Sequence, residues 1–183
     1  TLTRLFLTLT VLLGLTALTS FQTDFKKGDK VVLTKGNNSD TFFIGKTTIE
    51  EVLKKYGQTK VETYISKFRG KTAKQLYAKR QIIEYKDKGL TFIFEGDGVK
   101  PKKLATKDTC LLDEIIINFP SDYCVDNICI GTTKSDIVKK FGNGVYGITN
   151  GVTDSLNRVW YNSLGLWLSY KQTADNISLV QIH

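Results

Sequence analysis

Few side chains in this sequence are of the types that do covalent or metal chemistry. The three cysteines are Cys110, Cys124 and Cys129, and the single histidine is His183. With a single histidine, the sequence offers little basis for a Ser-His or Cys-His catalytic arrangement. The cysteine spacing does not match a zinc site either. We therefore expect no catalytic residues, no metal site and no cofactor.

Two weaker chemical patterns remain. Glu95 and Asp97 are close together, but acidic residues beside glycines near a strand end usually form turns, so a glycosidase-type carboxylate pair is the lesser alternative. The run "GNGVYG" (Gly142 to Gly147) lacks the Gly-Lys-Ser/Thr that follows in a phosphate-binding loop. Neither pattern predicts a small-molecule substrate.

The cysteine spacing bears on a disulfide. Cys124 and Cys129 enclose "VDNI", whose Asp-Asn pair favours a turn that brings the two sulfurs together. Cys110 and Cys124 flank an expected strand, which would hold them apart. The alternatives are a Cys124–Cys129 disulfide and three buried thiols.

The N-terminal segment indicates export. Arg4 is followed by an apolar run from Leu5 to Leu18, which suits the core of a signal peptide and is short for a membrane span. We expect residues 1–20 to be cleaved, a mature start near Phe21 and a secreted or periplasmic protein. An uncleaved anchor and a buried helix are the alternatives.

The net charge of +8 is unevenly distributed. Residues 21–110 hold 20 Lys/Arg and 11 Asp/Glu, a net +9, whereas residues 111–183 hold 5 and 7, a net −2. The basic half predicts either a solvated surface or contact with an acidic protein or an anionic lipid. Nucleic acid is not expected in an exported protein. The candidate contact is a basic loop containing Lys100, Lys102, Lys103 and Lys107.

One short segment occurs twice: "FFIGKTTIEEVLKKYG" (Phe42 to Gly57) and "ICIGTTKSDIVKKFG" (Ile128 to Gly142). Thr48 is followed three residues later by Glu51, and Thr133 by Asp136. A hydroxyl with an acid at this spacing marks a helix start, and the glycine that closes each segment suits a C-cap. Each copy predicts a short amphipathic helix.

The segments after the two helices also match each other. Residues 82–96 and 158–171 alternate apolar and polar side chains around a four-residue turn, which predicts a β-hairpin, and a third strand comes next at 111–119 and 176–182. This register pairs Tyr161 with Leu166 and Trp160 with Trp167; in the first copy it pairs Glu84 with Thr91.

Both tryptophans then lie on the face opposite the core. The alternatives are cross-strand aromatic pairing, cover from another part of the chain, and a binding hot spot. The candidate partner-binding residues are Trp160, Trp167, Ser169, Lys171 and Tyr146.

The expected fold class is α+β, with two tandem helix-loop-antiparallel β-meander units whose helices pack on one face of a sheet. The first repeat covers residues 42–119 and the second 128–183, with a lead-in at 21–41 and a connector at 120–127. The stretch "TAKQLYAKR" (Thr72 to Arg80) is a candidate second helix in the first repeat.

The order Ile-Gly-x-Thr, acid, aliphatic pair, Lys, aromatic and Gly, followed by an aromatic hairpin, resembles a known group. This group comprises the tandem units of β-lactamase inhibitory protein and outer-membrane assembly lipoproteins of the BamE (SmpA/OmlA) type. The resemblance covers residues 42–119 and 128–182. It implies a helix pair on a sheet whose open face is available to a protein partner. The sequence departs from the lipoproteins, which carry an acylated cysteine and usually one unit.

These patterns lead to one expectation of function and one alternative. We expect an exported, non-catalytic protein-binding module of inhibitor type. The alternative is a structural protein of the cell envelope or an accessory of outer-membrane assembly. Fold resemblance by itself does not decide between the two.

Overall fold

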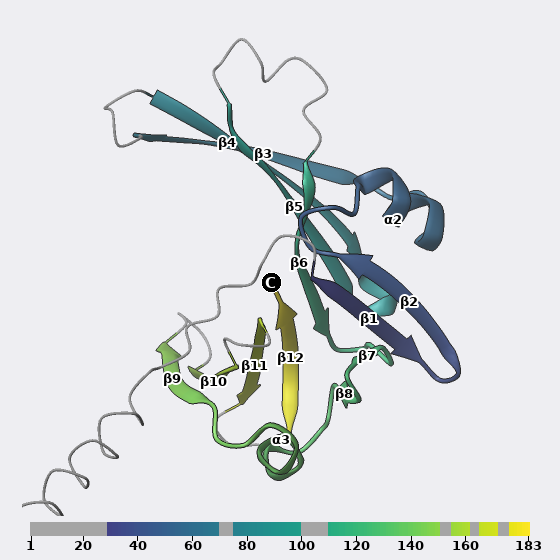
Figure 1. Ribbon diagram of the computed structural model, residues 1–183, viewed down its shortest axis with the longest axis vertical. Coiled ribbons are helices and arrows are strands. Elements are labelled where there is room, and N and C mark those ends of the chain that lie inside the picture. Colours follow the sequence, from purple (N-terminus) through teal and green to yellow (C-terminus); the bar gives the residue numbers. More distant parts are fainter. Residues whose placement is uncertain (1–28, 70–74, 100–109, 151–154, 162–164, 172–175) are drawn as a thin grey trace, which may run out of the picture.

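The computed structural model describes residues 29–69, 75–99, 110–150, 155–161, 165–171 and 176–183. Within these ranges the chain forms two antiparallel sheets (Figure 1). The larger sheet has eight strands in the order β3-β4-β5-β6-β12-β11-β10-β9, and the smaller has four in the order β2-β1-β7-β8. The two halves of the sequence meet in the larger sheet, where β6 pairs with β12.

The strands, grouped by sheet, and the helices have the following bounds. The smaller sheet contains β1 (Lys30–Lys35), β2 (Asn38–Phe43), β7 (Cys124–Val125) and β8 (Ile128–Cys129). The larger sheet contains β3 (Val61–Arg69), β4 (Gln75–Tyr85), β5 (Leu90–Val99), β6 (Leu111–Asn118), β9 (Val145–Asn150), β10 (Ser155–Tyr161), β11 (Leu166–Lys171) and β12 (Ile177–Ile182). The helices are α2 (Ile49–Tyr56), α3 (Lys134–Phe141) and the short 3-10 turn η2 (Lys86–Lys88).

The expected α+β class, with two helix-loop-meander units, is wrong because the described chain is mostly β. It has only two α-helices, of eight residues each, beside sheets of four and eight strands. The segments that follow each helix were expected to be loops, but they form strand β3 after α2 and strand β9 after α3. The candidate second helix is also wrong where it is described, since Gln75–Arg80 lies in β4. This strand pairs with β3 on one side and β5 on the other, and such pairing overrides a weak local helix preference.

Both α-helices begin where the sequence predicted. The Thr48 backbone N–H donates to Glu51 Oε2 over 2.7 Å, and the Glu51 N–H donates back to Thr48 Oγ1, which completes a capping box. In α3 the Asp136 N–H donates to Thr133 Oγ1 over 3.1 Å. These bonds satisfy backbone donors that a helix start otherwise leaves unpaired. The two predicted helix starts are confirmed.

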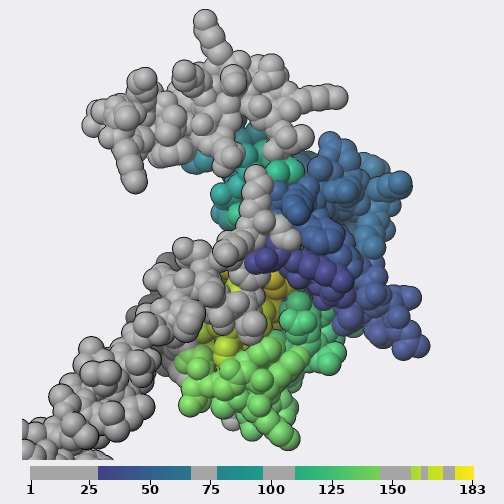
Figure 2. Space-filling view, viewed as in Figure 1, coloured from purple at the N-terminus to yellow at the C-terminus, as the bar shows by residue number. Residues whose placement is uncertain are grey.

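The helices and the smaller sheet share a hydrophobic core with the larger sheet. Val52 of α2 and Ile137 of α3 are buried in the same cluster as Leu33 of β1. The larger sheet contributes Phe92 and Leu168, which are fully buried. Figure 1 shows α2 and the strands β1 and β2 of the smaller sheet beside β5 and β6. Figure 2 shows the purple and blue segments of the first half of the chain above the green segments of the second half in space-filling form. One face of the larger sheet packs on the hydrophobic core. We use "open face" as a label for the opposite side, on which some residues, such as Glu114 and Ser169, are nevertheless buried.

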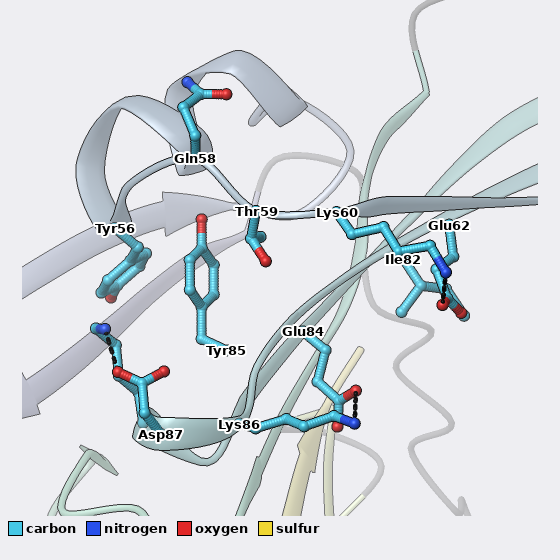
Figure 3. Close-up of a pocket in the computed structure, with 11 residues that line it drawn as sticks. Tyr56, Gln58, Thr59, Lys60, Glu62, Ile82, Glu84, Tyr85, Lys86 and Asp87 are labelled. Carbon is cyan, nitrogen blue, oxygen red and sulfur yellow. Dashed lines mark hydrogen bonds and ion pairs between the residues drawn. The ribbon is translucent and has the colours of Figure 1, made fainter.

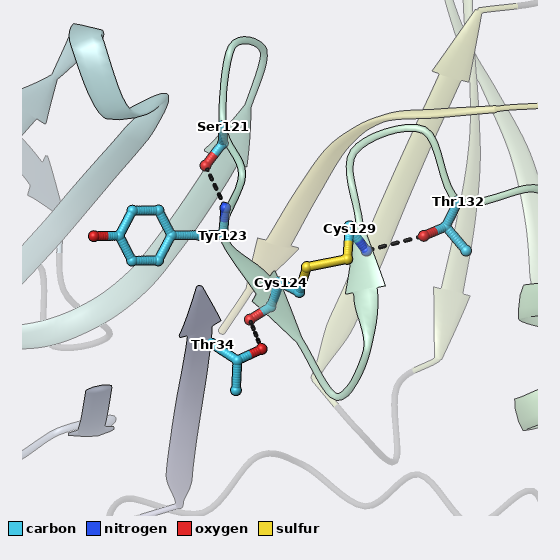
Figure 4. Close-up of a disulfide and its surroundings, with 6 residues drawn as sticks. All are labelled: Thr34, Ser121, Tyr123, Cys124, Cys129 and Thr132. Atoms are coloured by element: carbon cyan, nitrogen blue, oxygen red, sulfur yellow. Dashed lines mark hydrogen bonds between the residues drawn. A yellow bond between two sulfur atoms is a disulfide. The ribbon is translucent and has the colours of Figure 1, made fainter. Parts of the chain in front are cut away.

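A disulfide joins Cys124 and Cys129, the pair that the Asp-Asn turn suggested (Figure 4). The two cysteines are opposed in the β7–β8 pair, and the turn between them uses positive φ at Asp126 (49°) and Asn127 (61°). Asparagine and aspartate tolerate this backbone region better than most residues. Thr34 donates from Oγ1 to the Cys124 carbonyl over 3.4 Å. The disulfide thus closes the part of the smaller sheet that pairs with β1.

Candidate functional site

The strand register determines which side chains share the open face. Trp160 is opposed to Trp167, Trp167 to Gln181, and Gln181 to Ile116. Directly opposed residues in antiparallel strands point to the same side of a sheet. The adjacent residues Val159 and Leu168 are buried in the core, so this row lies on the open face. The predicted pairings of Trp160 with Trp167, and of Glu84 with Thr91, are confirmed.

Three rings meet on this face. The Trp160 and Trp167 ring centroids are 6.3 Å apart with an interplanar angle of 88°, an edge-to-face contact. The His183 ring lies 4.3 Å from Trp167, and its backbone N–H donates to the Gly165 carbonyl over 3.0 Å. Aromatic pairs of this kind add about 0.5–1.5 kcal/mol beyond area burial. The rings are therefore partly held by each other, while each remains only partly buried.

Polar atoms without partners gather around these rings. Ser169 is opposed to Arg158 and is fully buried, yet its Oγ has no hydrogen bond. Arg158 Nε, Gln181 Oε1 and His183 Nε2 are also buried without a hydrogen bond. These four are among only five such side-chain atoms in the described part of the chain. We call this cluster the tryptophan site; it contains Arg158, Trp160, Trp167, Ser169, Gln181 and His183.

A buried carboxylate connects the tryptophan site to the first half of the sheet. Glu114 is 4% exposed and accepts hydrogen bonds from Gln181 Nε2 at 2.6 Å and from Arg80 Nη2 at 3.3 Å. Arg80 Nε, the fifth unbonded atom, lies 3.2 Å from Glu95 Oε1 as an ion pair without hydrogen-bond alignment. Gln181 uses its N–H group on Glu114, and its carbonyl oxygen is left buried without a hydrogen bond.

A separate cavity of about 590 Å³ lies between the end of α2 and the turn after β4 (Figure 3). Its charged side chains pair with each other: Lys60 with Glu62 at 2.9 Å, Lys86 with Glu84 at 3.8 Å and Lys88 with Asp87 at 2.7 Å.

Its tyrosines are also bonded. The Tyr85 hydroxyl donates to the Gly57 carbonyl over 2.7 Å, and the Tyr56 hydroxyl donates to Asp40 over 2.6 Å. Burial, with the Asp40 carboxylate second, raises the pKa of Tyr56, so its hydroxyl stays protonated near neutral pH and keeps this bond. The two tyrosine hydroxyls and the charged pairs of the cavity are therefore already bonded within the chain.

The structure brings together some of the predicted binding residues. Trp160, Trp167 and Ser169 share the open face. The backbone of Tyr146 is opposed to Val159, and that of Lys171 to Leu156, while their side chains lie outside the described part of the structure. The basic loop (Lys100, Lys102, Lys103 and Lys107) and the expected signal peptide also lie outside the described residues.

The sequence reasoning missed Arg158, Gln181, His183, Arg80 and Glu114. For the first three a signal was present. Arg158 is two residues before Trp160, and Gln181 and His183 alternate with the core residues of β12, so period-two alternation places all three on the open face. Glu114 is harder to place, because the β5–β6 pairing shifts register between Ile93 and Phe94.

Comparison with known proteins does not identify this chain: no protein-family model, curated protein or solved structure matches it. The resemblance to the inhibitory protein and the lipoproteins therefore stays a prediction. None of the helices in the described ranges is long and apolar enough to cross a membrane.

Proposed function

We propose that this chain is an exported, non-catalytic binding protein that docks a protein partner on the open face of its larger sheet, at the tryptophan site. The observation that carries the proposal is the pair of opposed, partly buried tryptophans, Trp160 and Trp167. Their neighbours Val159 and Leu168 are buried in the core, so the two rings lie on the opposite side of the sheet. Tryptophan and arginine are the residues most enriched where interfaces concentrate their binding energy.

Two further features support this proposal. The edge-to-face contact between the Trp160 and Trp167 rings holds both side chains in place, which lowers the entropy that they lose when a partner binds. The Cys124–Cys129 disulfide fits an oxidising compartment and hence the expected export.

The test uses a double variant, Trp160→Thr with Trp167→Ser, because neither replacement introduces a charge. Purified wild-type and variant proteins are coupled to beads and incubated with envelope and medium fractions of the source cells. We expect proteins that are retained by the wild type to be lost by the variant, while the melting curve stays near normal. Phe119→Ser is the matched control, since Phe119 is 81% exposed and lies outside the tryptophan site.

Intrinsic fluorescence then identifies the contact directly. The chain has only two tryptophans, so its tryptophan emission reports the tryptophan site without a label. A captured partner that docks there shifts the emission of the wild type. The proposal is contradicted if wild type and double variant retain the same proteins, or if captured partners leave the emission unchanged.

A further inference from the structure

The larger sheet ends on one side in a long, regular strand. β3 is the last strand in the sheet order, so no described strand pairs with its outer edge, and in Figure 1 the ribbon of β3 and β4 extends away from α2. Every second residue of such an edge directs its backbone N–H and C=O away from the sheet. The nine residues of β3 include no proline and are opposed to β4 without a register shift. An added strand can therefore pair along this edge.

The edge is also open to solvent. Every residue from Glu62 to Ser66 is exposed, and two of them are large hydrophobic residues: Tyr64 is 53% exposed and Ile65 is 55% exposed. They are two of only four such exposed side chains in the described part of the chain. Adjacent residues of a strand point to opposite faces, so one of the two lies on each face of the sheet beside the edge. A strand that pairs with β3 would cover both.

The charge of this region indicates which kind of strand fits. Residues 60–81, which contain β3 and part of β4, hold seven Lys/Arg and one Asp/Glu, a net charge of +6. The single acid, Glu62, is already paired with Lys60 at 2.9 Å. Lys79, which is opposed to Ile65, makes no ion pair with any described residue. An acidic segment would supply the counter-charge that this region lacks.

A second copy of the chain does not fit this edge. Pairing of β3 with itself would bring two regions of net charge +6 to the strand spacing of about 4.8 Å, well within the Debye length of about 8 Å at physiological salt. Lysines on edge strands commonly prevent such self-pairing. The same charges attract an acidic strand, so the edge repels its own copies and favours a partner of opposite charge.

We infer that β3 is a second docking site, at which an extended acidic segment of another protein adds to the larger sheet as a further strand. Backbone hydrogen bonds to the β3 edge supply affinity, and side chains that alternate along the segment supply specificity. Opposed residues of paired strands have Cβ atoms about 4.5–5.5 Å apart. We therefore expect β-branched or aromatic residues opposite Tyr64 and Ile65, and Asp or Glu at the positions opposite Lys67 and Arg69.

This site does not depend on the proposed function. β11, which carries Trp167, is five strand positions from β3 in the larger sheet, or about 24 Å along it. The two sites share no residue. A peptide bound at β3 should therefore leave the tryptophan emission unchanged, whereas a partner at the tryptophan site shifts it.

The test is a selection on the full chain from a displayed library of random peptides about the length of β3. Enriched peptides are made with a fluorescent label, and their Kd is measured by fluorescence polarisation. Two matched probes accompany them: the same peptides with every acid replaced by its amide, and poly-glutamate of equal length. We expect enriched peptides to combine acids with β-branched or aromatic residues, and their amide analogues to bind about tenfold more weakly or worse.

Two proline variants test whether backbone pairing carries the binding. Thr63 and Ser66 are exposed and three positions apart, so their N–H groups point to opposite sides of β3. In one of Thr63→Pro and Ser66→Pro the proline removes a bond to β4 and lowers the melting temperature; in the other it removes an outward N–H and leaves the fold near normal. The folded variant should bind the peptides about tenfold more weakly or worse, because its ring also blocks the added strand. Tyr64→Thr with Ile65→Thr should weaken binding by about threefold or more.

A pair of double variants tests the role of charge. Lys67→Gln with Arg69→Gln removes two positive charges from β3 itself and should weaken peptide binding by about tenfold. The matched control, Lys139→Gln with Lys140→Gln, removes two charges from exposed positions near the end of α3. It should stay within about twofold of the wild type. If neither proline variant folds, the comparison of these two double variants decides the question.

The inference is overturned if no peptide is enriched, if the enriched peptides lack acids, or if the folded proline variant binds them as tightly as the wild type does. Equal binding of poly-glutamate, or capture of phosphatidylglycerol vesicles in place of peptides, would mean that the region recognises charge alone, and overturns it too. The Trp160→Thr, Trp167→Ser variant should bind the peptides like the wild type. Loss of binding in that variant assigns the peptides to the tryptophan site, which overturns the inference and supports the proposed function.

Discussion

Removal of the Glu114 carboxylate tests whether the polar network of the open face stabilises the fold. Glu114 is 4% exposed and is bonded to one residue on each side, Gln181 on β12 and Arg80 on β4. The Glu114→Ala change removes both bonds together. It also leaves the Gln181 amide with neither of its polar atoms bonded, since Oε1 already has no partner.

The two bonds have unequal energetic weight. The 2.6 Å bond from Gln181 is short, buried and charge-assisted, and bonds of this kind contribute about 1.5–3 kcal/mol. The ion pair with Arg80 contributes less than about 1 kcal/mol, because the Arg80 side chain is 42% exposed and keeps its contact with Glu95. Relief of the carboxylate desolvation offsets part of the loss. We expect a net destabilisation of about 2 kcal/mol, or roughly 4–8 °C in Tm for a domain of this size.

The assay is urea unfolding of the wild type, Glu114→Ala, Gln181→Ala and the double variant. The cycle should give a coupling of about 1–2 kcal/mol between Glu114 and Gln181, because the two residues are in direct contact. Glu95→Ala is the matched control; its side chain is 47% exposed, and its loss should cost less than about 1 kcal/mol. The reasoning is refuted if Glu114→Ala costs less than about 0.5 kcal/mol, or if Glu95→Ala costs as much.

Two further predictions concern the frame that holds the site. Replacement of Cys124 and Cys129 by serine should lower the free energy of unfolding by about 2 kcal/mol, because the disulfide closes a short loop. An unchanged urea midpoint would mean that the β7–β8 turn holds this loop closed without the disulfide. Gly89→Ala should destabilise the fold by more than about 2 kcal/mol in the same assay. Gly89 has φ +58°, and an added Cβ would collide with the Asn118 carbonyl and lie 2.8 Å from Ser121 N. A Gly36→Ala variant, with positive φ and open space, is the control and should lose clearly less.

The helices and hairpins were predictable because their signals are local. A capping threonine and its acid lie three residues apart, and the hairpin register results from alternation around a short turn. The same alternation predicted that Trp160 and Trp167 are opposed on the side away from the core, as the structure has them. It would also have placed Arg158 with the two tryptophans, so this part of the candidate site was within reach of the sequence.

The fold class was not predictable in the same way. Gln75–Arg80 is compatible with a helix when read alone, and it becomes a strand because β3 and β5 are both available to pair with it. The expected lead-in at residues 21–41 contains most of the hairpin formed by residues 30–43. This hairpin pairs with β7, and Thr34 bonds to Cys124, 90 positions away. No local pattern within either segment specifies that partner.

The sequence by itself therefore determined the two helices, their caps, the turn between the cysteines, and which face of the hairpin carries the tryptophans. Only the tertiary structure decided that a second sheet covers the core, and that Glu114 meets Gln181 from 67 positions away. The physical reason is the range of the interactions. Capping bonds and side-chain alternation act within a few residues, so a short window contains them. The choice among strand partners depends on the burial gained and the loop-closure entropy lost in each alternative pairing, and both are properties of the whole chain.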